Sequence, residues 1–217
     1  GGGGVYMTRN LNADFSQGGY SDWDDVYESA DDIGPYLNVP VTGDFIAGWT
    51  LEIGIGFMWS GQWFNISIGP TLVSGQANEA VYLAQENPDS SDGVTTSLRQ
   101  TLSYTVKASS KIHIRYRIDE SNCETGDIFH QAPLKILLNI GESEYLYKIY
   151  GQDSTIEDGR TIVTQGTWNE DTIPLPGLTS VGDSPHTIVV GDTISQMTAQ
   201  CHEWGYKVYI DDFTLLD

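Results

Sequence analysis

The chain has 217 residues, of which 30 are aspartate or glutamate and 10 are lysine or arginine, so its formal net charge is −20 at pH 7. This charge argues against nucleic acid as a partner, because binding phosphates requires the opposite sign. The length is typical of one all-β domain, and 24 glycines with 11% aromatic residues favour turns and packed strands over a helical bundle. No apolar run reaches the roughly 18 residues of a transmembrane helix, so we expect no membrane insertion.

Short segments with the period-2 alternation of half-buried strands follow one another along the chain. The alternation is cleanest over 111–118. We expect further strands at 48–53, 79–84, 98–102, 186–190 and 206–216. Residues 134–140 and 145–150 are expected to form a hairpin across 141–144. Without helical periodicity or internal repeats, this pattern predicts an antiparallel β-sandwich.

Three other stretches are expected to be irregular. Residues 20–32 are dense in acidic side chains and predict an acidic loop, which lacks the ligand pattern of an EF-hand. Residues 57–64 are the most aromatic window and predict a loop or hairpin tip. The first residues, 1–9, open with four glycines and predict a flexible leader or tag remnant, which leaves 10–217 as a single domain.

The order of these segments resembles the galactose-binding-domain-like jelly-roll superfamily, and in particular its non-catalytic carbohydrate-binding modules. The motifs that carry the resemblance are 12–16, Gly48-Trp49, 79–83 and 98–102 near the start, and Trp168 with 209–215 at the end. The resemblance implies a jelly roll and, as in many such modules, a structural calcium ion between the first and last strands. Carried over to this chain, the implied calcium ligands are Asp14, Ser16, Glu79 and Asp211 or Asp212.

Asp211 and Asp212 interrupt a closing segment that otherwise alternates like a strand. Adjacent strand residues point to opposite faces, so we expect one carboxylate to face inward or to lie at the sheet rim. A buried carboxylate needs a cation, a hydrogen-bond donor or a metal to offset its desolvation. The alternative to calcium is that one aspartate is solvated and the other caps backbone N–H groups.

Aromatic residues with polar neighbours predict sugar binding, because sugar rings stack on indole or phenol rings while polar side chains bond their hydroxyls. The candidate residues are Trp59, Gln62, Trp63, Tyr145 and Tyr147. The alternative is that these rings are buried, since a sandwich of this size packs several aromatics in its core.

Enzyme motifs are missing from the sequence: there is no HExxH, GxSxG or P-loop pattern. A zinc set of Cys123, His130, Cys201 and His202 lacks the spacing of a zinc finger. Glu142 and Glu144 could form a glycosidase pair, but two acids in a hairpin turn are more often solvated. We therefore expect no catalytic activity.

The function that these observations favour is a non-catalytic module that binds an oligo- or polysaccharide through exposed aromatics. We expect a secreted or cell-surface location, with other domains of a larger surface protein as further partners, and a disulfide between Cys123 and Cys201. The alternative function is a structural or adhesive module that mediates protein–protein contacts on a cell surface.

Overall fold

The computed structural model describes residues 6–16, 23–27, 39–41, 47–55, 64–71, 80–86, 94–119, 132–152, 157–202 and 207–217. All regular secondary structure in these ranges is β-strand. Within the same ranges no helix is long and apolar enough to cross a membrane.

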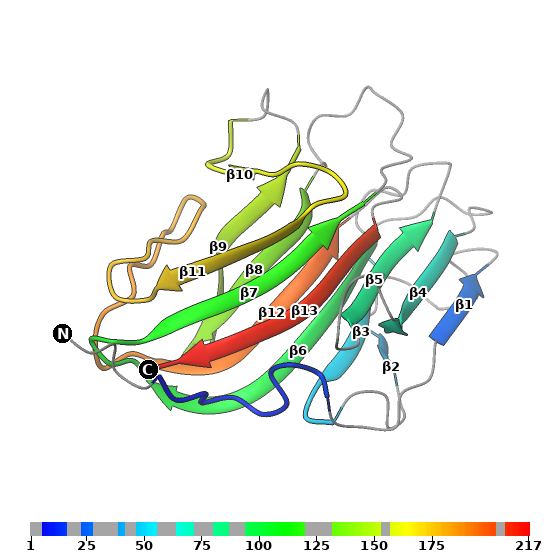
Figure 1. Cartoon of the computed structure of the whole chain (residues 1–217). Helices are drawn as coiled ribbons and strands as arrows, with labels where there is room; N and C mark the ends of the chain where they lie inside the picture. The colour runs from blue at the N-terminus through cyan, green and yellow to red at the C-terminus, as the bar shows by residue number, and fades with distance from the viewer. Residues whose placement is uncertain are drawn as a thin grey trace.

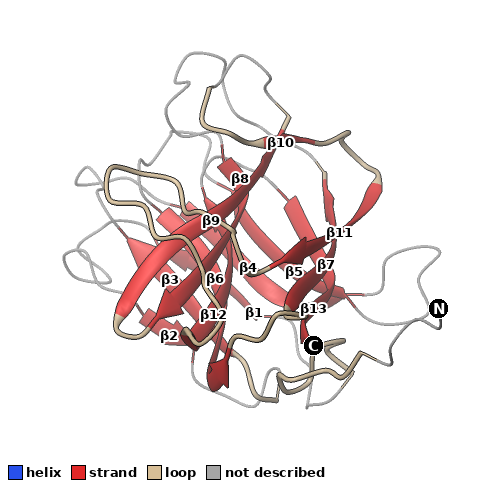
Figure 2. Ribbon diagram, turned by 90° about the vertical axis from the view of Figure 1, so that its left-hand side faces the viewer, coloured by secondary structure: helices blue, strands red, loops and turns tan. Residues whose placement is uncertain are grey.

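The strands form two sheets, which Figure 1 and Figure 2 show from two directions. The six-stranded sheet has the order β1 (Trp23–Tyr27), β4 (Phe64–Thr71), β5 (Ala80–Glu86), β13 (Lys207–Leu216), β7 (Lys111–Ile118) and β11 (Trp168–Pro174). The seven-stranded sheet has the order β10 (Thr161–Ile162), β9 (Ser143–Gly151), β8 (Ala132–Ile140), β12 (Thr193–His202), β6 (Val94–Thr105), β3 (Thr50–Ile55) and β2 (Val39–Val41). All described pairs are antiparallel except β9 with β10.

The core lies between the two sheets and draws buried side chains from both. Along β7 every second residue is buried, as the alternation over 111–118 predicted. Leu134, Ile136 and Leu138 of β8 face the same core from the other sheet. Each fully buried side chain of this size stabilises the fold by about 1.5–3 kcal/mol relative to an exposed one. The predicted antiparallel β-sandwich of the jelly-roll class is therefore confirmed, as is the hairpin of β8 and β9.

β12 was not predicted from the sequence, although it lies in the middle of the seven-stranded sheet. Its core residues are Ile194, Met197, Ala199 and Cys201, so the spacing is three residues and then two. The cause is a β-bulge, because the pairing register shifts between Ile194 and Gln196. One inserted residue breaks the period-2 pattern by which a strand is found in the sequence.

Two other expectations for the chain were wrong. The predicted acidic loop at 20–32 contains β1, which pairs with β4 as an edge strand. The predicted strand at 186–190 is a loop, because the carboxylate of Asp192 accepts bonds from the N–H of Val189 and from the His186 ring, which closes a turn. Phe64 begins β4, and the rest of the aromatic window lies outside the described residues.

The N-terminal segment completes the edge of β13 beyond the last residue that pairs with β5. The amide of Asn10 acts there as a peptide group would: its Nδ2 donates to the carbonyl of Phe213 (3.0 Å) and its Oδ1 accepts from the N–H of Leu215 (2.8 Å). The backbone N–H of Arg9 donates to the carbonyl of Leu215 in β13, and that of Met7 donates to the carbonyl of Asp217, just after the strand. A flexible leader was expected over residues 1–9, but residues 7–9 are paired with the end of the chain at 215–217.

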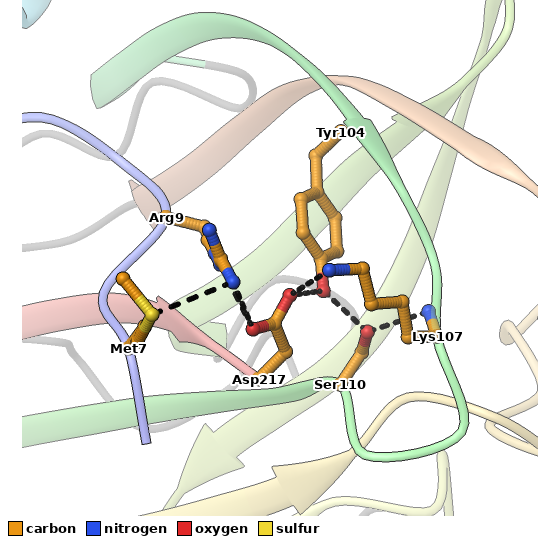
Figure 3. A network of polar contacts seen from close by, with 6 residues as sticks. All are labelled: Met7, Arg9, Tyr104, Lys107, Ser110 and Asp217. Carbon is orange, nitrogen blue, oxygen red and sulfur yellow. Dashed lines mark hydrogen bonds and ion pairs between the residues drawn. The ribbon is translucent and has the colours of Figure 1, made fainter. Parts of the chain in front are cut away.

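Figure 3 shows the polar network that fastens this segment to the last residue of the chain. Asp217 accepts a hydrogen bond from the Nε of Arg9 (2.8 Å) and another from the hydroxyl of Tyr104 (2.7 Å). Lys107 Nζ lies 3.3 Å from the same carboxylate. These donors, with Arg9 the strongest, lower the pKa of Asp217 to about 2. The two ends of the described chain are therefore held together by charge as well as by backbone pairing.

Candidate functional site

A β-bulge places both aspartates of the closing strand on the outer face of the six-stranded sheet. Ile210 and Phe213 face the core, and the register with β7 shifts between Ile210 and Asp212, which leaves Asp211 as the inserted residue. Neither carboxylate faces inward, because the extra residue removes the strict alternation on which that part of the expectation rested, and both lie where β13 no longer pairs with β5.

Asp211 is bound to an arginine rather than left for a metal ion. Its Oδ2 accepts a hydrogen bond from Nη1 of Arg115 at 2.8 Å, and the guanidinium lies over the Trp168 ring, 4.5 Å from its centroid. Glu170 approaches the Nε of Arg115 at 3.4 Å. We call these four residues, Arg115, Trp168, Glu170 and Asp211, the Arg115 cluster.

Asp212 and Asp14 are the two predicted calcium ligands that the fold brings near each other. The N–H of Phe213 donates to the carbonyl of Ala13 (3.0 Å), which holds the two segments side by side. Burial raises the pKa of Asp212, and the negative charges of Asp211 and Asp14 raise it further. The hydroxyl of Ser16, another predicted ligand, donates to Asp14 at 2.7 Å.

The structure does not assemble a complete metal site from the predicted ligands. In the described ranges no group of three or more histidine, cysteine, aspartate and glutamate side chains is placed to hold a metal ion. Glu79 lies outside these ranges, and so does Cys123, the predicted disulfide partner of the buried Cys201. The calcium site and the disulfide stay predictions.

The predicted sugar-binding aromatics divide into two groups. Trp59, Gln62 and Trp63 lie outside the described residues. Tyr147 is only 3% exposed, and burial raises the pKa of its hydroxyl. Tyr145 packs against the core, with its ring stacked on His186 at 5.1 Å. Tyr147 therefore offers no ring face to solvent, because the register of β9 turns both tyrosines toward the sandwich interior.

The outer face of the seven-stranded sheet carries a polar network that the sequence analysis missed. Thr198 lies between the core residues Met197 and Ala199 and so points away from the core, yet it is 0% exposed. Ser97 on β6 is 1% exposed and accepts a hydrogen bond from Nε2 of Gln200 at 3.1 Å. Small polar residues of an outer face are this deeply covered only where longer side chains lie over them.

The covering side chains include an ion pair that spans the middle of the sheet. Nη1 of Arg99 donates to Oε2 of Glu144 (3.0 Å) and to Oε1 of Gln196 (3.1 Å). Arg99 is on β6 and Glu144 on β9, and β12 and β8 lie between them, so their strands are about 14 Å apart. The two side chains therefore reach toward each other above β12 and β8.

Two polar atoms beneath this bridge make no hydrogen bond with any described residue: Oγ1 of Thr198 and Oδ1 of Asn139. We call the set the Arg99 face; its members are Ser97, Arg99, Asn139, Glu144, Gln196, Thr198 and Gln200. Arg99 falls within the predicted strand 98–102, so the sequence located the residue on a strand but did not single it out. Its contacts could not be inferred, because β12 had not been found and Glu144 was assigned only to the turn.

No family model and no curated protein matches the chain. Among solved structures it is similar to a family 11 carbohydrate-binding module from Clostridium thermocellum in complex with a β-1,3-1,4-mixed-linked tetrasaccharide; the identity is 13%, the match covers 84% of this chain and 96% of that one, and the TM-score is 0.46. It is also similar to TmCBM61 in complex with β-1,4-galactotriose, at 13% identity over 68% of this chain and 80% of that one, with a TM-score of 0.37.

A Stig cyclase, Fisc from Fischerella sp. TAU, is similar as well, at 13% identity over 98% of both chains, with a TM-score of 0.48. These likenesses concern the fold alone. The resemblance to jelly-roll carbohydrate-binding modules that the sequence suggested is found again at that level. A fold does not settle a function, so the function has to be argued from the residues of this chain.

Proposed function

We propose that this protein is a non-catalytic carbohydrate-binding module and that its Arg99 face binds a neutral glycan. The observation that carries the proposal is the pair of unsatisfied polar atoms, on Thr198 and Asn139, beneath the Arg99–Glu144 bridge. Buried polar groups are nearly always hydrogen-bonded, so two that are not, on one outer face, point to a partner that the described residues do not supply.

Sugar hydroxyls match these groups chemically. A hydroxyl both donates and accepts, so it can donate to Oδ1 of Asn139 and can bond the Thr198 hydroxyl in either sense. Arg99 donates and Glu144 accepts, and their charges cancel, which favours an uncharged ligand. No nucleophile of this face is hydrogen-bonded to a base, which supports binding without catalysis.

The bridge is weak enough for a ligand to displace. Glu144 is 36% exposed, and ion pairs that solvent reaches contribute roughly 0–1 kcal/mol. Each hydrogen bond to a charged side chain contributes about 1.5–3 kcal/mol. A glycan that separates Arg99 from Glu144 can replace their contact with hydrogen bonds to both side chains, and it also gives Thr198 and Asn139 partners that the described residues do not supply.

The experiment is calorimetric titration with soluble neutral oligosaccharides, including mixed-linkage β-glucan and β-1,4-galactan fragments. Arg99→Met should weaken binding about 10- to 100-fold, the loss of one or two charged hydrogen bonds. Thr105→Val, an exposed change at the end of the same strand, is the matched control and should leave the affinity unchanged. The proposal fails if no neutral oligosaccharide binds, or if Arg99→Met binds as tightly as the native chain.

The proposal places the module in a secreted or cell-surface protein, where it would hold a polysaccharide for neighbouring domains. The alternative function is adhesion, in which a protein partner occupies the same polar face. A pull-down that recovers protein partners with native chain but not with Arg99→Met, combined with no sugar binding, would favour adhesion.

We also propose that calcium binds beside β13, held by Asp14 and Asp212. The closeness of their charges, which contributes to the raised pKa of Asp212, supports this. Asp211 does not fit the ligand set, because Arg115 occupies its carboxylate. Calcium at 100 times its Kd should stabilise the fold by about 2.7 kcal/mol. An unchanged Tm on adding calcium to chelator-treated protein would remove this site.

A further inference from the structure

The Arg115 cluster lies on the other outer face of the sandwich and is built independently of the Arg99 face. Trp168 lies on the edge strand β11, opposite Arg117 of β7, and Arg115 is stacked on its ring. Asp211 fixes the guanidinium from the β13 side at 2.8 Å. Three neighbouring strands therefore contribute to the cluster: β11 supplies Trp168 and Glu170, β7 supplies Arg115 and β13 supplies Asp211.

Two polar atoms of this arrangement lack a hydrogen bond to any residue in the described ranges. One is the indole Nε1 of Trp168, which can only donate, and the other is Oδ1 of Asp211, which as a carboxylate can only accept. Asp211 is only 9% exposed, so bulk water does not satisfy it. The two atoms belong to the two side chains that hold the same guanidinium.

The chemistry of these two atoms selects the ligand. An ammonium group could donate to Asp211 but could not accept from the indole N–H. A carboxylate or phosphate could accept from the indole but could not donate to Asp211, whose negative charge would repel it. Neighbouring hydroxyl groups supply both functions without charge, and an indole ring beside them suits the C–H face of a sugar.

We propose that the Arg115 cluster is a second carbohydrate-binding site, which takes the neighbouring hydroxyl groups of one neutral sugar unit. Glu170 is the side chain that can open it: its side chain is 61% exposed and its contact with Arg115 is long, at 3.4 Å. Both the indole N–H and the carboxylate oxygen are buried, so sugar binding requires a covering side chain to move, and we assign that movement to Glu170 as the exposed member of the cluster.

The test follows the indole N–H resonances of the six tryptophans in nitrogen-15-labelled protein. The Trp168 resonance is the one that disappears in Trp168→Phe. The probes are methyl glycosides of glucose, galactose and mannose and their β-linked trisaccharides. With at least one probe the Trp168 resonance should shift saturably, because its donor gains an acceptor. Asp211→Asn, which keeps the shape of the side chain but loses its charge, should weaken this response about 10-fold.

Two comparisons separate this site from the Arg99 face and from a structural role. The response should persist unchanged in Arg99→Met, so the failure of one site does not imply the failure of the other. Thr172→Ala, two residues from Glu170 on the same outer row of β11, is the matched control and should respond like the native chain. The proposal is overturned if no sugar shifts the Trp168 resonance, if a short peptide amide shifts it and sugars do not, or if Asp211→Asn responds with unchanged affinity.

Discussion

Each sheet of the sandwich presents an arginine bound to a carboxylate on its outer face, but the two carboxylates differ in burial. The side chain of Asp211, the partner of Arg115, is 12% exposed, whereas that of Glu144, the partner of Arg99, is 36% exposed. Arg115 also stacks on Trp168, while Arg99 reaches across two strands to its partner.

The same pair of residue types can therefore have two roles. A buried carboxylate cannot lose its cation without a large desolvation cost, so Arg115 is a fixed part of its cluster. A solvated carboxylate exchanges its cation for water at little cost, so Arg99 is available to a ligand. In both places the atoms without a hydrogen bond to any described residue lie in or beside the arginine–carboxylate pair.

The largest expected effect is the difference in stability between the two arginine deletions. Arg115→Met leaves the buried Asp211 without its cation and should lower the free energy of unfolding by about 3 kcal/mol. Arg99→Met leaves Glu144 in contact with water and should lower it by less than about 1 kcal/mol. Urea denaturation of both variants measures this, and equal losses would contradict the distinction between a fixed and an exchangeable arginine.

A smaller effect of opposite sign is expected at Thr198. Thr198→Val keeps the shape of the side chain and removes a buried hydroxyl that has no bond to any described residue, so it should raise the free energy of unfolding by about 1 kcal/mol. The same change should weaken glycan binding if the hydroxyl contacts the glycan as proposed. Urea denaturation measures the expected gain in stability, and calorimetry on the same preparation measures the expected loss of glycan affinity. Thr105→Val is the control for both. A variant that is less stable, or more stable with unchanged affinity, would show that Thr198 is a packing residue only.

The smallest effect concerns pH and is confined to the six-stranded sheet. Because burial raises the pKa of Asp212 above its ordinary value of 3.8, the folded chain holds this proton more tightly than the unfolded chain does. The ionised group therefore costs stability, and the cost grows as the pH rises through and above 3.8. In chelator, Asp212→Asn should be more stable than the native chain at pH 7, and the difference should vanish below pH 3.8.

Calcium provides the control for the same variant. If Asp14 and Asp212 hold the ion, calcium should reverse the order and make the native chain the more stable of the two. Denaturation curves from pH 3 to 8 with and without calcium decide this. A native chain that is more stable than Asp212→Asn at pH 7 in chelator would contradict the direction of the pKa shift.

How far the sequence predicted this molecule depended on where strict alternation holds. The strand over 111–118 and the hairpin of β8 and β9 were found because each has a regular pattern or a clear turn. β12 was missed, and Asp211 was misplaced, because each lies at a β-bulge that shifts the alternation by one residue. A bulge depends on the pairing of two strands distant in sequence, so one strand alone does not reveal it.

The candidate sites were harder to predict than the fold for a related reason. The Arg99–Glu144 contact joins residues on strands that two others separate, and the stack of Arg115 on Trp168 depends on the register between β7 and β11. Composition could identify residue types suited to sugar binding, as it did for Tyr145 and Tyr147. It could not tell that β9 turns these two rings toward the core.

The most direct test of the account is to map the glycan contact on labelled protein while an oligosaccharide that binds in calorimetry is added. The account predicts that the side-chain resonances of Arg99, Asn139 and Gln196 and the backbone amide of Thr198 shift together, with one common Kd equal to the calorimetric value. These residues lie on three strands of one face, so a common response locates the ligand there. Saturable binding that leaves all four unchanged would contradict the central claim.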